Sequence, residues 1–393
     1  MMCLETQHFK LNRFLLLTIG LWPLKQSNLT RFQFIILSSV LTTSIIFQLT
    51  IFVTLRCTPN LVVKVLSSTC LFSISAIKYN LFSLKMEAVK DLLIKLQEIH
   101  DGLKDKNEIA IMKEYSCLAK RYTAVLTILG LYSSFSIIIA LFWSSIFYLI
   151  LPINISISHH LPIMMEYFID QEIYFYLIPL HISVAMFIAM TVAIAIGAMF
   201  VAYDQHICAM FKISSYRIKR AVHIITLGVN KSKKENLILK GIISAVNIHR
   251  QAIKLSEFLV SKIQTMLFCL IIVGVIFLSL NLFRIFQIAS SGDDVEEFIF
   301  PFQFVTFSIV YMFLANYIAQ DLTDHNNHIF TTVYDVQWHI APLHIQKMIL
   351  FLLQRGAKDY TINVGGLFVG SLECFATLVK ASVSYFTFMY STQ

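Results

Sequence analysis

The sequence predicts an all-α membrane protein with seven transmembrane helices. Of its 393 residues, 57% are hydrophobic and only 14% are charged, whereas soluble domains carry about 25% charged residues. A soluble fold of this length could not hide so much apolar surface from water. The composition therefore argues against a soluble enzyme, a nucleic-acid-binding protein and a disordered scaffold, in spite of the net charge of +8.

Five long stretches without charge each predict one transmembrane helix, since about 20 residues cross the hydrocarbon core. The second of these stretches ends where Pro152 and the polar residues 154–161 predict a loop. The fourth is uncharged from residue 263 to residue 283 and is extended to residue 289. The predicted bounds of these five spans are 32–55, 122–153, 173–203, 263–289 and 298–320.

Two further spans are apolar but contain charges. Residues 61–84 carry Lys64 and Lys78 near their ends, where long side chains can reach the lipid headgroups. Residues 360–389 carry Glu373 and Lys380, seven positions apart and therefore on one helical face. These two residues either form a neutralising pair or make separate contacts to neighbouring helices, or their face lines a water-filled cavity or pore.

The distribution of basic residues predicts which ends lie in the cytoplasm. Of the 31 Lys and Arg residues, 26 fall in the N-terminal arm (1–31) and in the segments 85–121, 212–262 and 321–359. The positive-inside rule places these segments, and the N-terminus, in the cytoplasm and the C-terminus outside. This is the reverse of a G-protein-coupled receptor. Asn154, in an Asn-Ile-Ser sequon of a predicted outer loop, is a glycosylation candidate.

The N-terminal arm and the segment 321–359 are expected to lie outside the bilayer core. Residues 15–24 are too short to span it, so we expect them along the membrane surface with Trp22 at the interface, and no signal peptide is expected. Residues 342–355 predict an amphipathic helix that Gly356 ends. Beyond it, Gly366-x-x-x-Gly370 predicts a helix face for close packing.

No motif supports an enzyme. The sequence has no phosphate-binding loop, no Gly-x-Gly-x-x-Gly, no His-Glu-x-x-His and no Cys-x-x-Cys, so we expect no catalytic residue and no cofactor. Asp321, Asp324, His325 and His328 resemble a metal cluster, but a solvated stretch is the simpler interpretation, and no metal is expected. A transporter is disfavoured because Glu373 is the single carboxylate well inside a span.

The C-terminal quarter resembles one receptor family. The motifs are LLQRG at 352–356, GGLF at 365–368, SLECF at 371–375 and LVKASVSYFTF at 378–388, preceded by YDVQW at 334–338 and PLHIQK at 342–347. This pattern is similar to the C-terminal signature of insect odorant receptors. It covers about residues 320–391, and the divergent remainder resembles an odour-tuned subunit rather than the shared co-receptor.

The resemblance implies a ligand-gated, non-selective cation channel that carries monovalent and divalent cations. Family members form tetramers in the plasma membrane of sensory dendrites, in which tuned subunits assemble with the co-receptor. The seventh span lines the pore, Phe388 lies at its apolar constriction, and Ser384, Ser391 and Thr392 are further pore candidates. The co-receptor has Gln and Leu at the last two positions, so the contribution of this subunit to the gate stays open.

A small volatile odorant is expected in the outer half of the helix bundle, in an aromatic cavity with few polar groups. Trp143 and Tyr176 are favoured because each joins an apolar ring to a polar group. The candidates are Phe72 in the second span, Ser136, Ile139 and Trp143 in the third, Tyr176, Leu180 and Val184 in the fourth, and Phe300, Phe304 and Phe307 in the sixth. The alternatives are a gustatory-type ligand-gated channel and a metabotropic seven-helix receptor.

Overall fold

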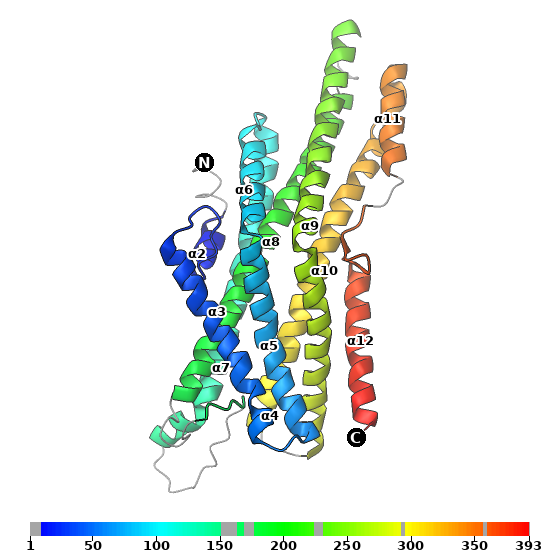
Figure 1. Cartoon of the computed structure of the whole chain (residues 1–393). Coiled ribbons are helices and arrows are strands. Elements are labelled where there is room, and N and C mark those ends of the chain that lie inside the picture. Colours follow the sequence, from blue (N-terminus) through cyan, green and yellow to red (C-terminus); the bar gives the residue numbers. More distant parts are fainter. Residues whose placement is uncertain are drawn as a thin grey trace.

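The computed structural model describes residues 9–150, 163–168, 177–223, 231–291, 295–356 and 360–392. Long helices lie side by side along one axis and form an elongated bundle (Figure 1). The predicted residues Asn154 and Tyr176, and the side chain of Trp143, lie outside the described part of the chain.

The helices are α2 (Lys10–Thr18), α3 (Asn28–Leu49), α4 (Ile51–Thr54), α5 (Pro59–Leu84), α6 (Met86–Asp101), α7 (Lys106–Ile150), α8 (Leu177–His223), α9 (Lys231–Ser291), α10 (Val295–Asp335), η2 (Trp338–Ile340), α11 (Leu343–Gly356) and α12 (Leu372–Ser391).

Within the described residues, six helical segments are long and apolar enough to cross a membrane, and they correspond to the first six predicted spans. The all-α prediction is therefore confirmed, but the helices run well past the predicted ends. The α9 helix has 61 residues and α8 has 47, so at 1.5 Å per residue each is more than twice as long as the hydrocarbon core is thick. These continuations form a second region beyond the apolar one.

The seventh predicted span starts later than expected. Residues 360–371 precede the helix and contain a two-stranded antiparallel hairpin of β1 (Asn363–Val364) and β2 (Phe368–Val369). Gly365 and Gly366 form the turn of this hairpin, with φ values of 64° and 75°. Residues other than glycine rarely adopt such φ values. The expectation that Gly366-x-x-x-Gly370 forms a helix face is therefore wrong. Gly370 still permits a close approach, since a Cβ there would lie 2.6 Å from Ala319 Cβ.

The α12 helix has 20 residues, enough for one crossing. It is not among the six strongly apolar segments, because Glu373, Lys380 and several hydroxyl side chains lower its mean hydropathy. The Ser371 side chain caps its start by accepting a hydrogen bond from the Cys374 backbone N–H at 3.1 Å.

The N-terminal arm packs into the bundle. Trp22 is only 2% exposed, so its ring contacts the protein interior and not the surface of the chain, where it was expected. The Asn12 side chain donates to the Ala198 carbonyl at 2.9 Å, and the Tyr79 hydroxyl donates to the Ile19 carbonyl at 2.7 Å. The arm packs into the bundle because burial of its apolar side chains against α8 and α5 removes more surface from water than a single membrane-facing stripe would.

The two lysines of α5 both contact side chains of other helices. Lys64 Nζ pairs with Glu297 Oε1 at 2.7 Å. Lys78 is 2% exposed, and its ammonium lies 3.6 Å from the centroid of the Tyr311 ring. A ring face can hold a buried cation in place of water, which is why the expectation of an exposed Lys78 is wrong.

The predicted cytoplasmic segments gather at one end of the bundle. In Figure 1, α6, α11 and the adjoining ends of α8 and α9 reach the upper end, whereas α12 runs to the lower end together with α4 and the start of α5. We call these the inner and the outer end. Which of them faces the cytoplasm stays a prediction from the charge distribution.

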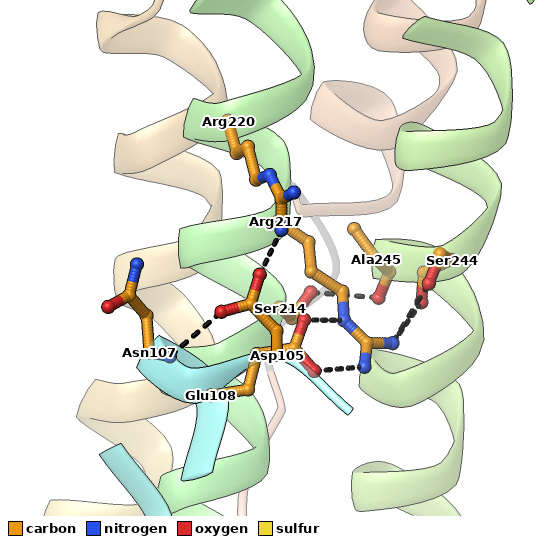
Figure 2. Close-up of polar contacts among 8 residues, drawn as sticks. All are labelled: Asp105, Asn107, Glu108, Ser214, Arg217, Arg220, Ser244 and Ala245. Carbon is orange, nitrogen blue, oxygen red and sulfur yellow. Dashed lines mark hydrogen bonds and ion pairs between the residues drawn. The ribbon is translucent and has the colours of Figure 1, made fainter. Parts of the chain in front are cut away.

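An ion-pair clamp joins three helices at the inner end (Figure 2). Arg217 of α8 binds Glu108 of α7 through two hydrogen bonds of 2.7 Å and also donates to Ser244 Oγ of α9 at 2.9 Å. Arg220 pairs with Asp105 nearby. A two-pronged guanidinium–carboxylate contact fixes both distance and orientation.

Glu108→Gln should destabilise the protein by about 1–3 kcal/mol, because it removes the ion pair of a largely buried guanidinium. Asp105→Asn is the matched control, since its partner Arg220 is 61% exposed and its loss should cost less than about 1 kcal/mol. The midpoint of thermal unfolding of the purified protein measures both. An equal decrease for the two variants would contradict the role of the clamp.

Candidate functional site

An aromatic cluster fills the outer half of the bundle. Phe72 of α5 is fully buried, and Phe300 and Phe304 of α10 are almost fully buried. The ring centroids of Phe300 and Phe304 lie 6.3 Å apart, and that of Phe277 on α9 lies 5.8 Å from Phe304. Spacings of this size are typical of favourable edge and offset contacts between rings. Phe300 and Phe304 are therefore in ring contact with Phe277, and Phe72 belongs to the same apolar core of the chain.

A few polar groups accompany this cluster. Gln303 of α10 donates to Ser136 Oγ of α7 at 2.9 Å, which connects one more predicted residue to it. Asn281, one turn after Phe277, donates to the Phe277 carbonyl at 2.8 Å. Among the described residues, Gln303 Oε1, Asn281 Oδ1 and Gln48 Nε2 are buried without a hydrogen-bond partner. A buried polar group without a partner lowers the stability of the fold by about 1–3 kcal/mol. A polar molecule that reached one of these groups would therefore form a hydrogen bond without breaking another.

The other predicted ligand residues lie apart from this cluster. Ile139, Leu180 and Val184 are exposed on the outer surface of the single chain. Phe307 is partly buried, and its ring lies 5.9 Å from that of Tyr311. The helical spacing indicated correctly that residues share a face, but it could not indicate which face turns inward.

Four site residues were not among the predicted ones, namely Gln48, Phe277, Asn281 and Gln303. The three amides had a signal in the sequence, since polar side chains within an apolar span tend to face the bundle interior. Phe277 had none, because it is one of many Phe residues in the chain.

The α12 helix has two distinct faces. Leu378, Ser382 and Phe386 are buried against the bundle, and the ring of Phe386 lies 4.6 Å from that of Phe286 on α9. The opposite face follows the spacing of three and four residues and is exposed along its whole length. We call it the open face, and its residues are Glu373, Thr377, Lys380, Ser384, Thr387, Phe388 and Ser391.

The open face brings together all predicted pore residues of this helix. Ser384, Phe388 and Ser391 lie on it, and Thr392 is exposed just after its end. Glu373 and Lys380 also lie on it, and neither forms an ion pair with another described residue. The alternative of a neutralising pair within one chain therefore receives no support from the described contacts.

A cleft of about 370 Å³ lies between α9, α10 and the residues before β1. Its lining includes His249, Glu257, Asn326 and Tyr360, but none of the predicted ligand residues. Burial raises the pKa of Tyr360 to about 12, so its hydroxyl stays protonated and donates to Ser256. The cleft lies toward the inner end, away from the aromatic cluster.

Comparison with known proteins shows which chains this one resembles. The family model described as 7tm Odorant receptor matches residues 58–383. Odorant receptor 9a of Drosophila melanogaster is 20% identical over 344 residues, which cover 84% of this chain and 82% of the relative. The insect olfactory receptor OR5 from Machilis hrabei in complex with eugenol has a TM-score of 0.79 at 15% identity, with 99% of both chains covered. A second structure of OR5 has a TM-score of 0.77 at 13% identity, with 98% of both chains covered.

Phe304→Ala should destabilise the protein by about 3–5 kcal/mol, because it removes a buried ring and leaves a cavity at the centre of the aromatic cluster. Phe302→Ala is the matched control two residues away, since Phe302 is 55% exposed. Thermal unfolding of the two variants, followed by size-exclusion chromatography, measures the difference. If Phe302→Ala were the more damaging change, the assigned inward face of α10 would be wrong.

Proposed function

The chain belongs to the 7tm Odorant receptor family, whose members are multi-pass membrane proteins and ligand-gated channels rather than enzymes. On this premise we propose that it is an odour-tuned subunit that assembles with a co-receptor into a non-selective cation channel of the plasma membrane of sensory neurons. The observation that supports this proposal most directly is the open face of α12.

The open face is unsuited to contact with lipid. It carries Glu373 and Lys380, and a charged side chain within a bilayer costs several kcal/mol unless water or a partner group compensates it. It also carries a row of hydroxyl groups. Assembly of several chains around a central axis would turn this face toward water and remove that cost. Phe388, at the outer end of the row, would then form an apolar ring that closes the pore by excluding water.

We propose that the odorant binds within the aromatic cluster. Phe72, Phe277, Phe300 and Phe304 would supply an apolar surface, and Asn281 or Gln303 would supply a single hydrogen bond. The OR5 structure holds eugenol, a small aromatic molecule with few polar atoms, and a ligand of that kind fits this chemistry. Trp143 and Tyr176 stay predicted contacts. With so few polar groups, the shape of the ligand should dominate selectivity, and tuning should be moderately broad.

When this chain and a co-receptor subunit are expressed together, volatile apolar odorants should evoke a cation current without added G protein. The proposed mechanism contains no second messenger, so the current should persist when nucleotides are removed from the cytoplasmic solution. Whole-cell recording across a broad odour panel measures it, with the co-receptor alone as the control. No current in spite of surface delivery, or a strict need for GTP, would refute the channel proposal for this chain.

Ser384→Cys and Ser382→Cys form a matched pair for the pore. Ser384 is exposed on the open face, whereas Ser382 is fully buried against the bundle. A charged thiol reagent applied during odour stimulation should therefore reduce the current through the Ser384→Cys channel at least several-fold faster than the current through Ser382→Cys. Equal rates for the two variants would show that α12 does not present this face to the ion path.

A further inference from the structure

A cluster of four potential metal ligands, two buried on α8 and two partly buried on α10, lies where these helices face each other toward the inner end. Asp204 and Cys208 are one turn apart on α8, and Asp321 and His325 are one turn apart on α10. The Cys208 Sγ lies 3.9 Å from Asp204 Oδ2 and 3.9 Å from Asp321 Oδ2. His325 Nδ1 lies 3.2 Å from Asp321 Oδ1. One ligand atom from each of Cys208, Asp321 and His325 lies within 4.8 Å of the others.

The sequence indicated only half of this cluster. Asp321, Asp324, His325 and His328 were expected to form a solvated stretch, and that interpretation holds for Asp324 and His328, which are exposed. Asp321 and His325 turn the other way because they are four residues apart on the face that packs against α8. Asp204 and Cys208 complete the group from 113 or more positions earlier in the chain, a distance that no local motif spans.

The charges of the cluster are not balanced by a strong base. Asp204 is 4% exposed, and its carboxylate contacts the Gln205 amide at 3.4 Å and the Cys208 thiol. Among the described Lys and Arg side chains, none forms an ion pair with Asp204 or Asp321, and Lys212 nearby is exposed to solvent. Asp321 pairs with His325 instead, whereas the buried Asp204 carboxyl and the Cys208 thiol have only these weak contacts, so a cation would improve their surroundings.

We propose that Asp204, Cys208, Asp321 and His325 bind a zinc ion. One sulfur, one imidazole nitrogen and carboxylate oxygens are ligands that Zn²⁺ accepts in a tetrahedral arrangement. Their soft thiolate disfavours Mg²⁺ and Ca²⁺, which prefer oxygen ligands alone. With zinc–ligand bonds of about 2.0–2.3 Å, ligand atoms stand roughly 3.3–3.8 Å apart. The observed Cys208–Asp321 and His325–Asp321 distances lie close to that range.

The surrounding residues orient the ligands in the way that known metal sites require. The Tyr115 hydroxyl of α7 contacts His325 Nε2 at 2.8 Å, which leaves Nδ1 on the side of the carboxylates. The Gln205 amide donates to Asp321 Oδ2 at 3.1 Å and fixes that carboxylate. On binding, Nδ1 exchanges its contact with the Asp321 carbonyl, at 2.8 Å, for the metal. The thiol proton of Cys208, and any proton on the other ligands, passes to solvent.

A zinc ion at this place would connect α8 and α10, and Tyr115 would link α7 to the site through His325. In the chain, α10 is followed by α11 at the inner end and then by α12, so the metal would stiffen a helix that precedes the one with the open face (Figure 1). This inference concerns the isolated chain and does not depend on odorant binding or on channel activity.

Zinc content and stability of the full-length chain test the proposal. Protein purified without a histidine tag and dialysed against zinc and then against metal-free buffer should hold about one zinc per chain by mass spectrometry. Zinc should raise its unfolding temperature, and a strong chelator should reverse the rise. Cys208→Ala should abolish both effects, whereas Cys269→Ala, at a half-buried cysteine of α9, should keep them. Tyr115→Phe should weaken zinc binding roughly tenfold.

Cobalt provides an independent measurement if a variant does not fold. Co²⁺ added to the metal-free native chain should give a thiolate-to-cobalt charge-transfer band, which zinc removes by competition. A band in the native chain and in Cys269→Ala supports the site. Absence of the band in the native chain, zinc well below one per chain, or equal binding by Cys208→Ala and Cys269→Ala would each overturn the proposal, and would leave a plain hydrogen-bonded network of Asp321 and His325.

Discussion

Backbone hydrogen bonding without water determines the architecture of this chain. Inside a bilayer each peptide group must find its partner within the protein, which permits helices and closed barrels only. The helices α7, α8, α9 and α10 are longer than the bilayer is thick and extend beyond it, where water could also satisfy peptide groups. The same helices therefore lie partly in the bilayer and partly in water. Only their side chains change between the two surroundings.

The two regions are stabilised differently. The outer half contains ring contacts such as Phe277–Phe304, together with polar contacts such as Lys64–Glu297. The inner half is held by directional contacts, of which the Arg217–Glu108 clamp is the clearest. Apolar packing is tolerant of small shape changes, whereas a two-pronged ion pair fixes one geometry. This division fits a protein whose outer end adapts to a small ligand, while its inner end holds the helices in fixed relative positions.

The sequence predicted the existence and order of the spans, because long apolar runs measure the thickness of the bilayer directly. It did not predict where helices end, since the cytoplasmic continuations are amphipathic and have no hydropathy signal of that kind. It placed Trp22 and Lys78 at the membrane surface, but tertiary contacts with distant helices bury both. The C-terminal motif indicated the family, and the open face of α12 gathered the predicted pore residues. Some predicted ligand residues lie in the core and others on the surface, because helical periodicity indicates which residues share a face but not whether that face turns inward.

The hairpin between α11 and α12 has a mechanical consequence. A continuous helix would transmit bending from one segment to the next, but the glycine turn at residues 365 and 366 interrupts the rod. The α12 helix therefore begins as a separate rod beside Ala319 of α10, at Gly370, and contacts α9 near its other end through Phe386 and Phe286. Any tilt of this rod about its start would displace its far end most, where Phe388 lies.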